Sequence, residues 1–180
     1  MSEAQDIAEF AAPAAAAAEL TTWTGFRFHV RTAEPADRAA LGELFKKVSD
    51  DDRRFRFLSA VRQVDQDLLT RMTEVDHERT EDFLAFDGEA LIASAMLAAD
   101  AEGDRAEVAI SVRADYKHRG VGWALLDHVA RFAAGRGISL IESIESRDNV
   151  EAITLEKEMG FTATAYAGDP ALVLLQKKLA

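Results

Sequence analysis

The chain has 180 residues, 48% of them hydrophobic, which is enough to bury the core of one domain. A formal net charge of −11 opposes binding to nucleic acid, because most of the surface would repel phosphates, and it favours a cationic partner. Cysteine is absent and the four histidines lack metal-ligand spacing, so we expect no disulfide, no thiolate nucleophile and no metal site.

The N-terminal segment is rich in alanine, is interrupted by Pro13 and contains few large apolar side chains. We expect residues 1–22 to form an extension, either solvated or loosely docked as a helix, and residues 23–180 to form the folded domain. The acidic start is unlike a signal sequence, and no apolar run approaches the ~18 residues of a membrane helix. These features predict a cytoplasmic protein without a membrane partner.

The first half of the domain is predicted to contain one strand and two helices. Residues 26–31 alternate apolar and polar side chains, which is typical of a half-buried strand. Helical spacing then predicts one helix that begins near Pro35 and ends by 49–52, and another over 63–75. Between them, 53–58 mix three arginines with three large apolar residues. This segment is either a loop that fills the core or a wall of an acceptor cleft.

The second half is predicted to contain a strand meander followed by alternating helices and strands. Turn signals separate the expected elements, which are strands at 83–86, 90–98 and 105–112, a helix over 120–134, a strand from 138, a helix over 149–158 and a closing hairpin. We therefore predict an α/β (α+β) fold, with a mixed, mostly antiparallel sheet of six to seven strands and helices on both faces.

A basic loop with two glycines follows the strand that ends at Val112. Gly120 and Gly122 lack the Cβ atoms that would keep a ligand from the backbone, and the first N–H groups of the next helix have no helical acceptor. Such a turn attracts a phosphate, and Lys117 and Arg119 add positive charge. A Rossmann fingerprint needs a third glycine and a P-loop needs Gly-Lys-Ser or Gly-Lys-Thr. An ordinary charged turn stays open as an explanation.

Two motifs resemble those of the GNAT acyltransferase superfamily. Lys117 to Gly122, KHRGVG, is similar to its acyl-CoA pyrophosphate loop, with Lys117 in place of the usual Arg or Gln. Asn149 to Phe161, NVEAITLEKEMGF, is similar to its second signature, and the two agree in order and separation. The resemblance implies acetyl-CoA as co-substrate, held by a set of residues that act mainly through the backbone: Ile110, Val112, Lys117, His118, Arg119, Gly120, Val121, Gly122 and Asn149.

A narrower resemblance concerns the acceptor. Residues 53–87 and 107–128 look like the acetyltransferase domain of bacterial protein-lysine acetyltransferases, where it often follows a CoA-ligase-like domain that this sequence does not contain. The resemblance implies acetyl transfer to an amine, first of all a protein lysine. A small-molecule amine acceptor and a non-catalytic acyl-CoA sensor stay open as alternatives, as does a homodimer.

The resemblance also implies residue roles. A lysine amine with a pKa of ~10.4 is almost fully protonated at pH 7, so acyl transfer needs a base. Glu107 stands where similar lysine acetyltransferases place a catalytic glutamate, and we expect apolar neighbours such as Val108 and Phe83 to raise its pKa. The backbone N–H of Ile110 or Val112 would stabilise the oxyanion.

Glu156 is a departure from the family pattern, because many members carry a tyrosine there that protonates the departing thiolate. Given its charged neighbours Lys157 and Glu158, we interpret Glu156 as a helix-surface residue, with protonation left to water or the substrate. We interpret His118 as a loop residue that is solvated or meets a phosphate. Trp123 is expected to pack against the core.

Overall fold

The structure is a computed structural model that describes residues 15–58 and 64–179. The strands within these residues are β1 (Ala18–Thr21), β2 (Arg27–Thr32), β3 (Thr80–Asp87), β4 (Ala90–Ala99), β5 (Arg105–Val112), β6 (Leu140–Ser146), β7 (Thr162–Ala165) and β8 (Leu172–Lys178). They form one eight-stranded sheet in the order β1-β2-β3-β4-β5-β6-β8-β7. All pairs are antiparallel except β5 with β6. The predicted mixed, mostly antiparallel fold is confirmed, but the strand count of six to seven was too low.

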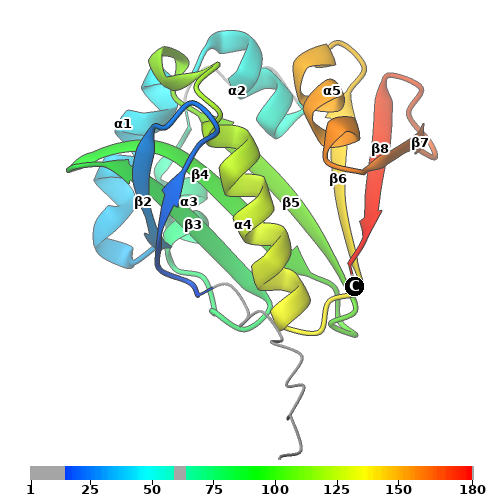
Figure 1. The fold of residues 1–180 in the computed structure, drawn as a ribbon, viewed down its shortest axis with the longest axis horizontal. Coiled ribbons are helices and arrows are strands. Elements are labelled where there is room, and N and C mark those ends of the chain that lie inside the picture. The colour runs from blue at the N-terminus through cyan, green and yellow to red at the C-terminus, as the bar shows by residue number, and fades with distance from the viewer. Residues whose placement is uncertain (1–14, 59–63, 180) are drawn as a thin grey trace, which may run out of the picture.

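Helices lie on both faces of the sheet, as predicted (Figure 1). They are α1 (Arg38–Lys47), α2 (Asp50–Phe57), α3 (Gln66–Thr73), α4 (Val121–Gly135) and α5 (Val150–Glu158). On one face, α4 buries Leu125 and Val129 against Phe83 and Val108 of the sheet. On the other face, α1 and α3 form a second core cluster with Leu84. Among the described residues, none of the helices has the length and apolar character required to cross a membrane.

The additional strand is β1, and it lies inside the segment predicted to be an extension. It pairs antiparallel with β2, so that Leu20 is opposite Phe28, and Leu20 packs against the α4 side of the core. A strand of four residues with one large apolar side chain gives little signal in the sequence. It forms because its pairing with β2 stabilises it. The sheet therefore begins at Ala18 and not after residue 22. Residues 1–14 of the predicted extension lie outside the described residues.

Residues 53–58 belong to helix α2 and its C-cap, so the prediction of a loop was wrong. Ser49 caps this helix, because its Oγ accepts a hydrogen bond of 3.1 Å from the Asp52 N–H. Three aspartates occupy the first turn, where the helix dipole favours negative charge. The acidic run at 49–52 thus follows the end of α1 and also begins α2. The helix predicted over 63–75 is α3, and residue 63 lies outside the described part of the chain.

A fork between β5 and β6 opens the sheet. The two strands pair only at their beginnings, through Arg105 with Leu140, Ala106 with Ile141 and Glu107 with Glu142. Beyond that point β5 stays paired with β4, and β6 stays paired with β8. The two strands consequently diverge toward the end of the molecule where α2 and α5 lie (Figure 1).

Candidate active site

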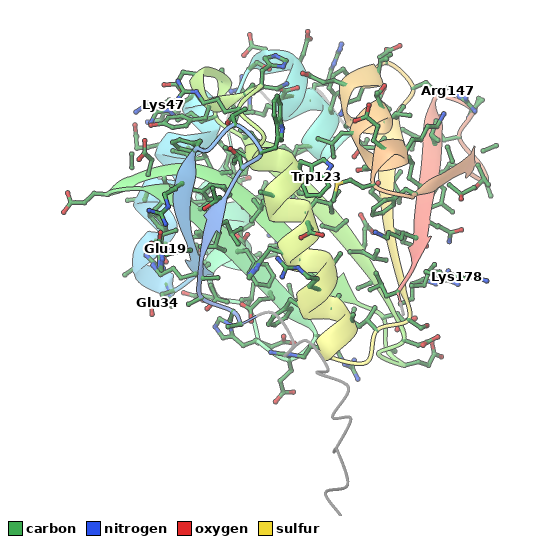
Figure 2. All side chains as sticks on the ribbon, viewed as in Figure 1. Glu19, Glu34, Lys47, Trp123, Arg147 and Lys178 are labelled. Carbon is green, nitrogen blue, oxygen red and sulfur yellow. The ribbon has the colours of Figure 1, made fainter. Side chains whose placement is uncertain are left out.

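A cavity of about 600 Å³ occupies the fork. Its walls come from α2, β5, the loop before α4, the first turn of α4, β6 and α5. Figure 2 shows Trp123 near the N-terminal end of α4. Trp123 lines the cavity and is 42% exposed, so the expectation that it packs in the core was wrong.

The N-terminus of α4 forms the anion-attracting side of the cavity. The N–H of Ala124 makes the early helical hydrogen bond to the Gly120 carbonyl (3.0 Å), and the amides of Val121, Gly122 and Trp123 precede it. The first N–H groups of a helix lack helical acceptors and carry the positive end of its dipole. These three residues all line the cavity. The backbone predicted to hold a pyrophosphate is therefore at the cavity wall.

The two glycines of the loop differ in whether the structure leaves room for a side chain. Gly120 has a φ of +83°, and a Cβ there would lie 2.9 Å from Trp23 Nε1 and 3.0 Å from Thr22 Cβ. Gly120 is thus required by its backbone conformation and by the packing of Trp23. A Cβ on Gly122 would meet its nearest atoms, in Leu155 and Val112, at 3.9 Å, an ordinary contact distance. An alanine fits at Gly122 but not at Gly120.

The cations of the loop are engaged by neighbouring protein groups. Lys117 Nζ lies 2.7 Å from Asp52 Oδ2 and 2.9 Å from Glu151 Oε2, so it joins α2 to α5. His118 is largely exposed, with its Nδ1 3.0 Å from Glu151 Oε1. The Arg119 guanidinium lies over the Tyr116 ring, 4.7 Å from its centroid. The backbone amides are the groups left to face a ligand.

Lys117→Met should lower the free energy of unfolding by roughly 1–2 kcal/mol, between the values typical of exposed and buried ion pairs. The reason is that the substitution leaves the partly buried Asp52 carboxylate without its cation. Thermal denaturation at low and high salt measures this effect. Lys46→Met is the matched control, because Lys46 and Glu43 form an exposed pair. If Lys117→Met is no less stable than Lys46→Met, the ion pairs of Lys117 with α2 and α5 do not stabilise the fold.

The open edge of β5 presents backbone donors to the cavity. Successive residues of a strand direct their N–H groups to opposite edges. The N–H of Arg113 bonds the Ile92 carbonyl of β4 (2.8 Å), so the N–H groups of Ile110 and Val112 are directed to the other edge, into the fork. Both residues line the cavity. Either amide is oriented to meet an oxyanion there.

Glu107 lies at the vertex of the fork, in the last residue pair that joins β5 to β6. Its side chain is exposed to the cavity, yet partial burial and the neighbouring Glu142 raise the pKa of its carboxyl, while Arg56 opposes that rise. Val108 and Phe83 belong to the core on the α4 side, and residues adjacent to Glu107 on the strand face the opposite side of the sheet. The predicted direction of the pKa shift is confirmed, but Glu142 was missed as a cause.

The pKa of Glu107 should follow the charges around it. Glu142→Gln removes a negative neighbour and should lower that pKa. Arg56→Met removes a positive neighbour and should raise it. Carboxyl ¹³C NMR from pH 5 to 8 measures both shifts. A shift in the same direction in both variants would argue that these two charges do not act on Glu107.

The second motif contributes residues to the same cavity. The Asn149 side chain caps α5 through the Ala152 N–H (3.4 Å) and donates through Nδ2 to Glu145 Oε2 (3.0 Å). Glu156 is 6% exposed and accepts a hydrogen bond of 2.6 Å from the Ser143 hydroxyl. The interpretation of Glu156 as a helix-surface residue was therefore wrong. Asn149, Glu145 and Glu156 all line the cavity.

Arg56, Glu145 and Trp23 are among the cavity residues that were not identified as site residues from the sequence. Arg56 of α2 lines the cavity, and its charge interacts with the carboxylates of Asp82, Glu107 and Glu145. The mixed arginine and apolar pattern of 53–58 was a signal for it, since one of its two explanations was a cleft wall. Glu145 and Trp23 had no comparable signal, because neither belongs to a motif.

The fold and the cavity together define a class of protein. A forked mixed sheet with unpaired strand amides, an anion-attracting helix N-terminus and a carboxylate at the vertex is typical of an acyltransferase that uses a CoA thioester. Residues 45–161 match the model of the Acetyltransferase (GNAT) family, and the chain belongs to this family. It is an acetyltransferase whose acyl donor is acetyl-CoA.

Relatives agree with this assignment. Acetyltransferase PA5475 of Pseudomonas aeruginosa is 25% identical over 149 residues, covering 81% of this chain and 80% of that protein. The crystal structure of the GNAT domain of S. lividans PAT is similar with a TM-score of 0.84 and 26% identity, covering 91% of this chain and 97% of that one. The fold also matches yncA, a putative acetyltransferase from Salmonella typhimurium solved with its cofactor acetyl-CoA (TM-score 0.66, 20% identity, 85% of this chain and 94% of that one).

Proposed function

We propose that this acetyltransferase transfers the acetyl group of acetyl-CoA to the side-chain amine of a protein lysine, with Glu107 as the general base. The observation that carries the proposal is the position of Glu107 at the vertex of the fork, exposed to the cavity and with a raised pKa. A base whose pKa is raised toward the working pH both accepts a proton readily and returns it to solvent.

The proposed reaction divides the cavity into two ends. The pyrophosphate of acetyl-CoA binds the first-turn amides of α4, namely those of Val121, Gly122 and Trp123. The thioester carbonyl lies in the fork, where the N–H of Ile110 or Val112 stabilises the oxyanion. Glu107 removes a proton from the ammonium group of the acceptor, and the neutral amine then attacks the carbonyl carbon.

The choice of a lysine acceptor rests on charge and on similarity. The net charge of −11 favours a cationic acceptor, and the similarity to the GNAT domain of S. lividans PAT extends over 91% of the chain. A polyamine or an aminoglycoside would satisfy the same charge preference. An acyl-CoA sensor would retain the α4 amides but would not need Glu107.

A panel of acceptors tests the proposal. Purified protein with acetyl-CoA is given lysine peptides, polyamines and aminoglycosides, and thiol release is followed over time. We expect lysine peptides to have the highest kcat/KM. Faster turnover of a polyamine or an aminoglycoside would show that the acceptor is a small-molecule amine and not a protein lysine. Release no faster than hydrolysis with every amine would favour the sensor.

A further inference from the structure

Glu145 of β6 and Glu156 of α5 form a carboxyl pair at the wall of the cavity. The two side chains are within hydrogen-bonding reach of each other. Outside the pair, the Ser143 hydroxyl donates to Glu156 (2.6 Å) and the Asn149 amide donates to Glu145 (3.0 Å). Each carboxyl is therefore held in place by a neutral donor, and the pair faces the cavity.

Two carboxyls at this separation cannot both be ionised without strong repulsion, so the pair retains one proton. Burial and the charge of Glu156 raise the pKa of Glu145 to about 8, although Arg56 of α2 and the Asn149 amide oppose the rise. Burial also raises the pKa of Glu156, while its hydrogen bonds with Ser143 and Glu145 favour its ionised form. The raised pKa of Glu145 favours the arrangement in which Glu145 holds the shared proton and donates it to Glu156.

The register of the fork places Glu145 relative to the reacting group. Glu107 and Glu142 are the last paired residues of two parallel strands. Three residues farther along, β5 reaches Ile110 and β6 reaches Glu145, at the same depth on opposite sides of the opening. A thioester carbonyl that meets the Ile110 amide would therefore have Glu145 across the fork.

We propose that Glu145 is the general acid that protonates the departing CoA thiolate, and that Glu156 is a positioning residue that keeps the proton on Glu145. The inference rests on the proposed function, because it assigns a second proton transfer to the same reaction. It also gives a role to a carboxyl pair, half-buried at Glu145 and buried at Glu156, that the base Glu107 does not explain.

The proton balance of the step is complete. The ammonium group loses one proton to Glu107, which passes it to solvent, and the neutral nitrogen then bonds the carbonyl carbon. As the carbon–sulfur bond breaks, the nitrogen gives its second proton to Glu107. The sulfur takes the pair of electrons from that bond and the proton from Glu145, which yields CoA thiol and an amide. Turnover leaves Glu107 protonated and the pair without its proton, and exchange with solvent restores both groups.

The test compares kcat at saturating acceptor from pH 6 to 10 for the wild type, Glu145→Gln and Glu156→Gln. A general acid must be protonated, so wild-type kcat should fall on an alkaline limb. Glu145→Gln should lower kcat by roughly 100-fold and abolish that limb. Glu156→Gln removes the negative charge that holds the proton, so its limb should move to lower pH. Glu156→Asp should restore the limb toward the wild-type position.

Two controls separate this role from a structural one. Acetyl-CoA affinity, followed by tryptophan fluorescence, should change less than about threefold in each variant, and Glu89→Gln, at an exposed turn, should keep the wild-type profile. Carboxyl ¹³C NMR of the wild type should show a glutamate that titrates well above the ordinary range and disappears in Glu145→Gln.

The outcomes distinguish the inference from the proposed function. Wild-type turnover with an alkaline limb that is unchanged in both variants overturns the role of Glu145 and leaves the acetyltransferase reaction standing. A limb that stays in place in Glu156→Gln while kcat falls assigns Glu156 a structural role and overturns its positioning role. A wild type that releases no CoA with any amine overturns both the proposed function and the acid.

Discussion

Glu107→Gln is expected to lower kcat by about 1,000-fold and to leave acetyl-CoA binding intact, since a general base typically contributes 10²–10⁴-fold. Gln has almost the same shape as Glu but cannot accept a proton at neutral pH. Thiol release measures the rate. The chain has two tryptophans, Trp23 and Trp123, and both line the cavity, so their fluorescence reports binding.

The same experiment has an internal check. As the pH approaches the pKa of the acceptor amine, a growing fraction of the acceptor is already neutral and the base becomes less necessary. The difference between the wild type and Glu107→Gln should therefore narrow at high pH. Glu102→Gln, in the exposed turn between β4 and β5, is the control for charge alone. Unchanged turnover in Glu107→Gln at pH 7 would remove Glu107 as the base.

Gly120→Ala is expected to destabilise the protein by about 1–3 kcal/mol and to weaken acetyl-CoA binding at least tenfold. The first effect follows from a left-handed backbone conformation that a Cβ disfavours, with Trp23 Nε1 only 2.9 Å from that Cβ. The second follows because Gly120 is the N-cap of α4, so any shift moves the amides of the first turn. Thermal unfolding and fluorescence titration measure the two effects.

Gly122→Ala is the matched comparison. Its φ is not in the left-handed region and its Cβ would have ordinary contacts, so stability should be equal to or higher than that of the wild type. Trp23→Ala combined with Gly120→Ala should recover the part of the loss that is due to the contact with Trp23, but not the parts due to φ and to the contact with Thr22. Equal losses at the two glycines would contradict separate structural roles.

The elements predicted from periodicity were the ones with strong local patterns. The strands of the meander, α1, α4, α5 and the closing hairpin were all anticipated, because burial of one face imposes a repeating pattern on the residues themselves. The two errors had weak patterns. β1 has only Leu20 as a large apolar residue, and α2 has arginines between its apolar residues, so the pairing of β1 and the capping of α2 decide their structure.

Glu156 demonstrates the limit of a local interpretation. Charged neighbours in the sequence suggested a solvated helix face, and Lys157 and Glu158 are indeed exposed. Adjacent residues of a helix point in directions about 100° apart, so they do not share an environment. The face of Glu156 is covered by β6, where Ser143 donates to it. Burial of this carboxyl depends on a strand that lies 13 residues earlier.

The sequence by itself determined the family, the fold class and the two ends of the candidate site. The family and the two ends of the site depend on short contiguous motifs, in which glycines, a helix start and a strand residue have fixed spacing. The fold class depends on the periodicity and order of the predicted elements. The tertiary structure decided which charges face one another: Lys117 with Asp52, Glu107 with Glu142, and Glu145 with Glu156. The physical reason is that pKa values and ion pairs depend on distances of a few ångströms between residues far apart in the chain, and folding alone sets those distances.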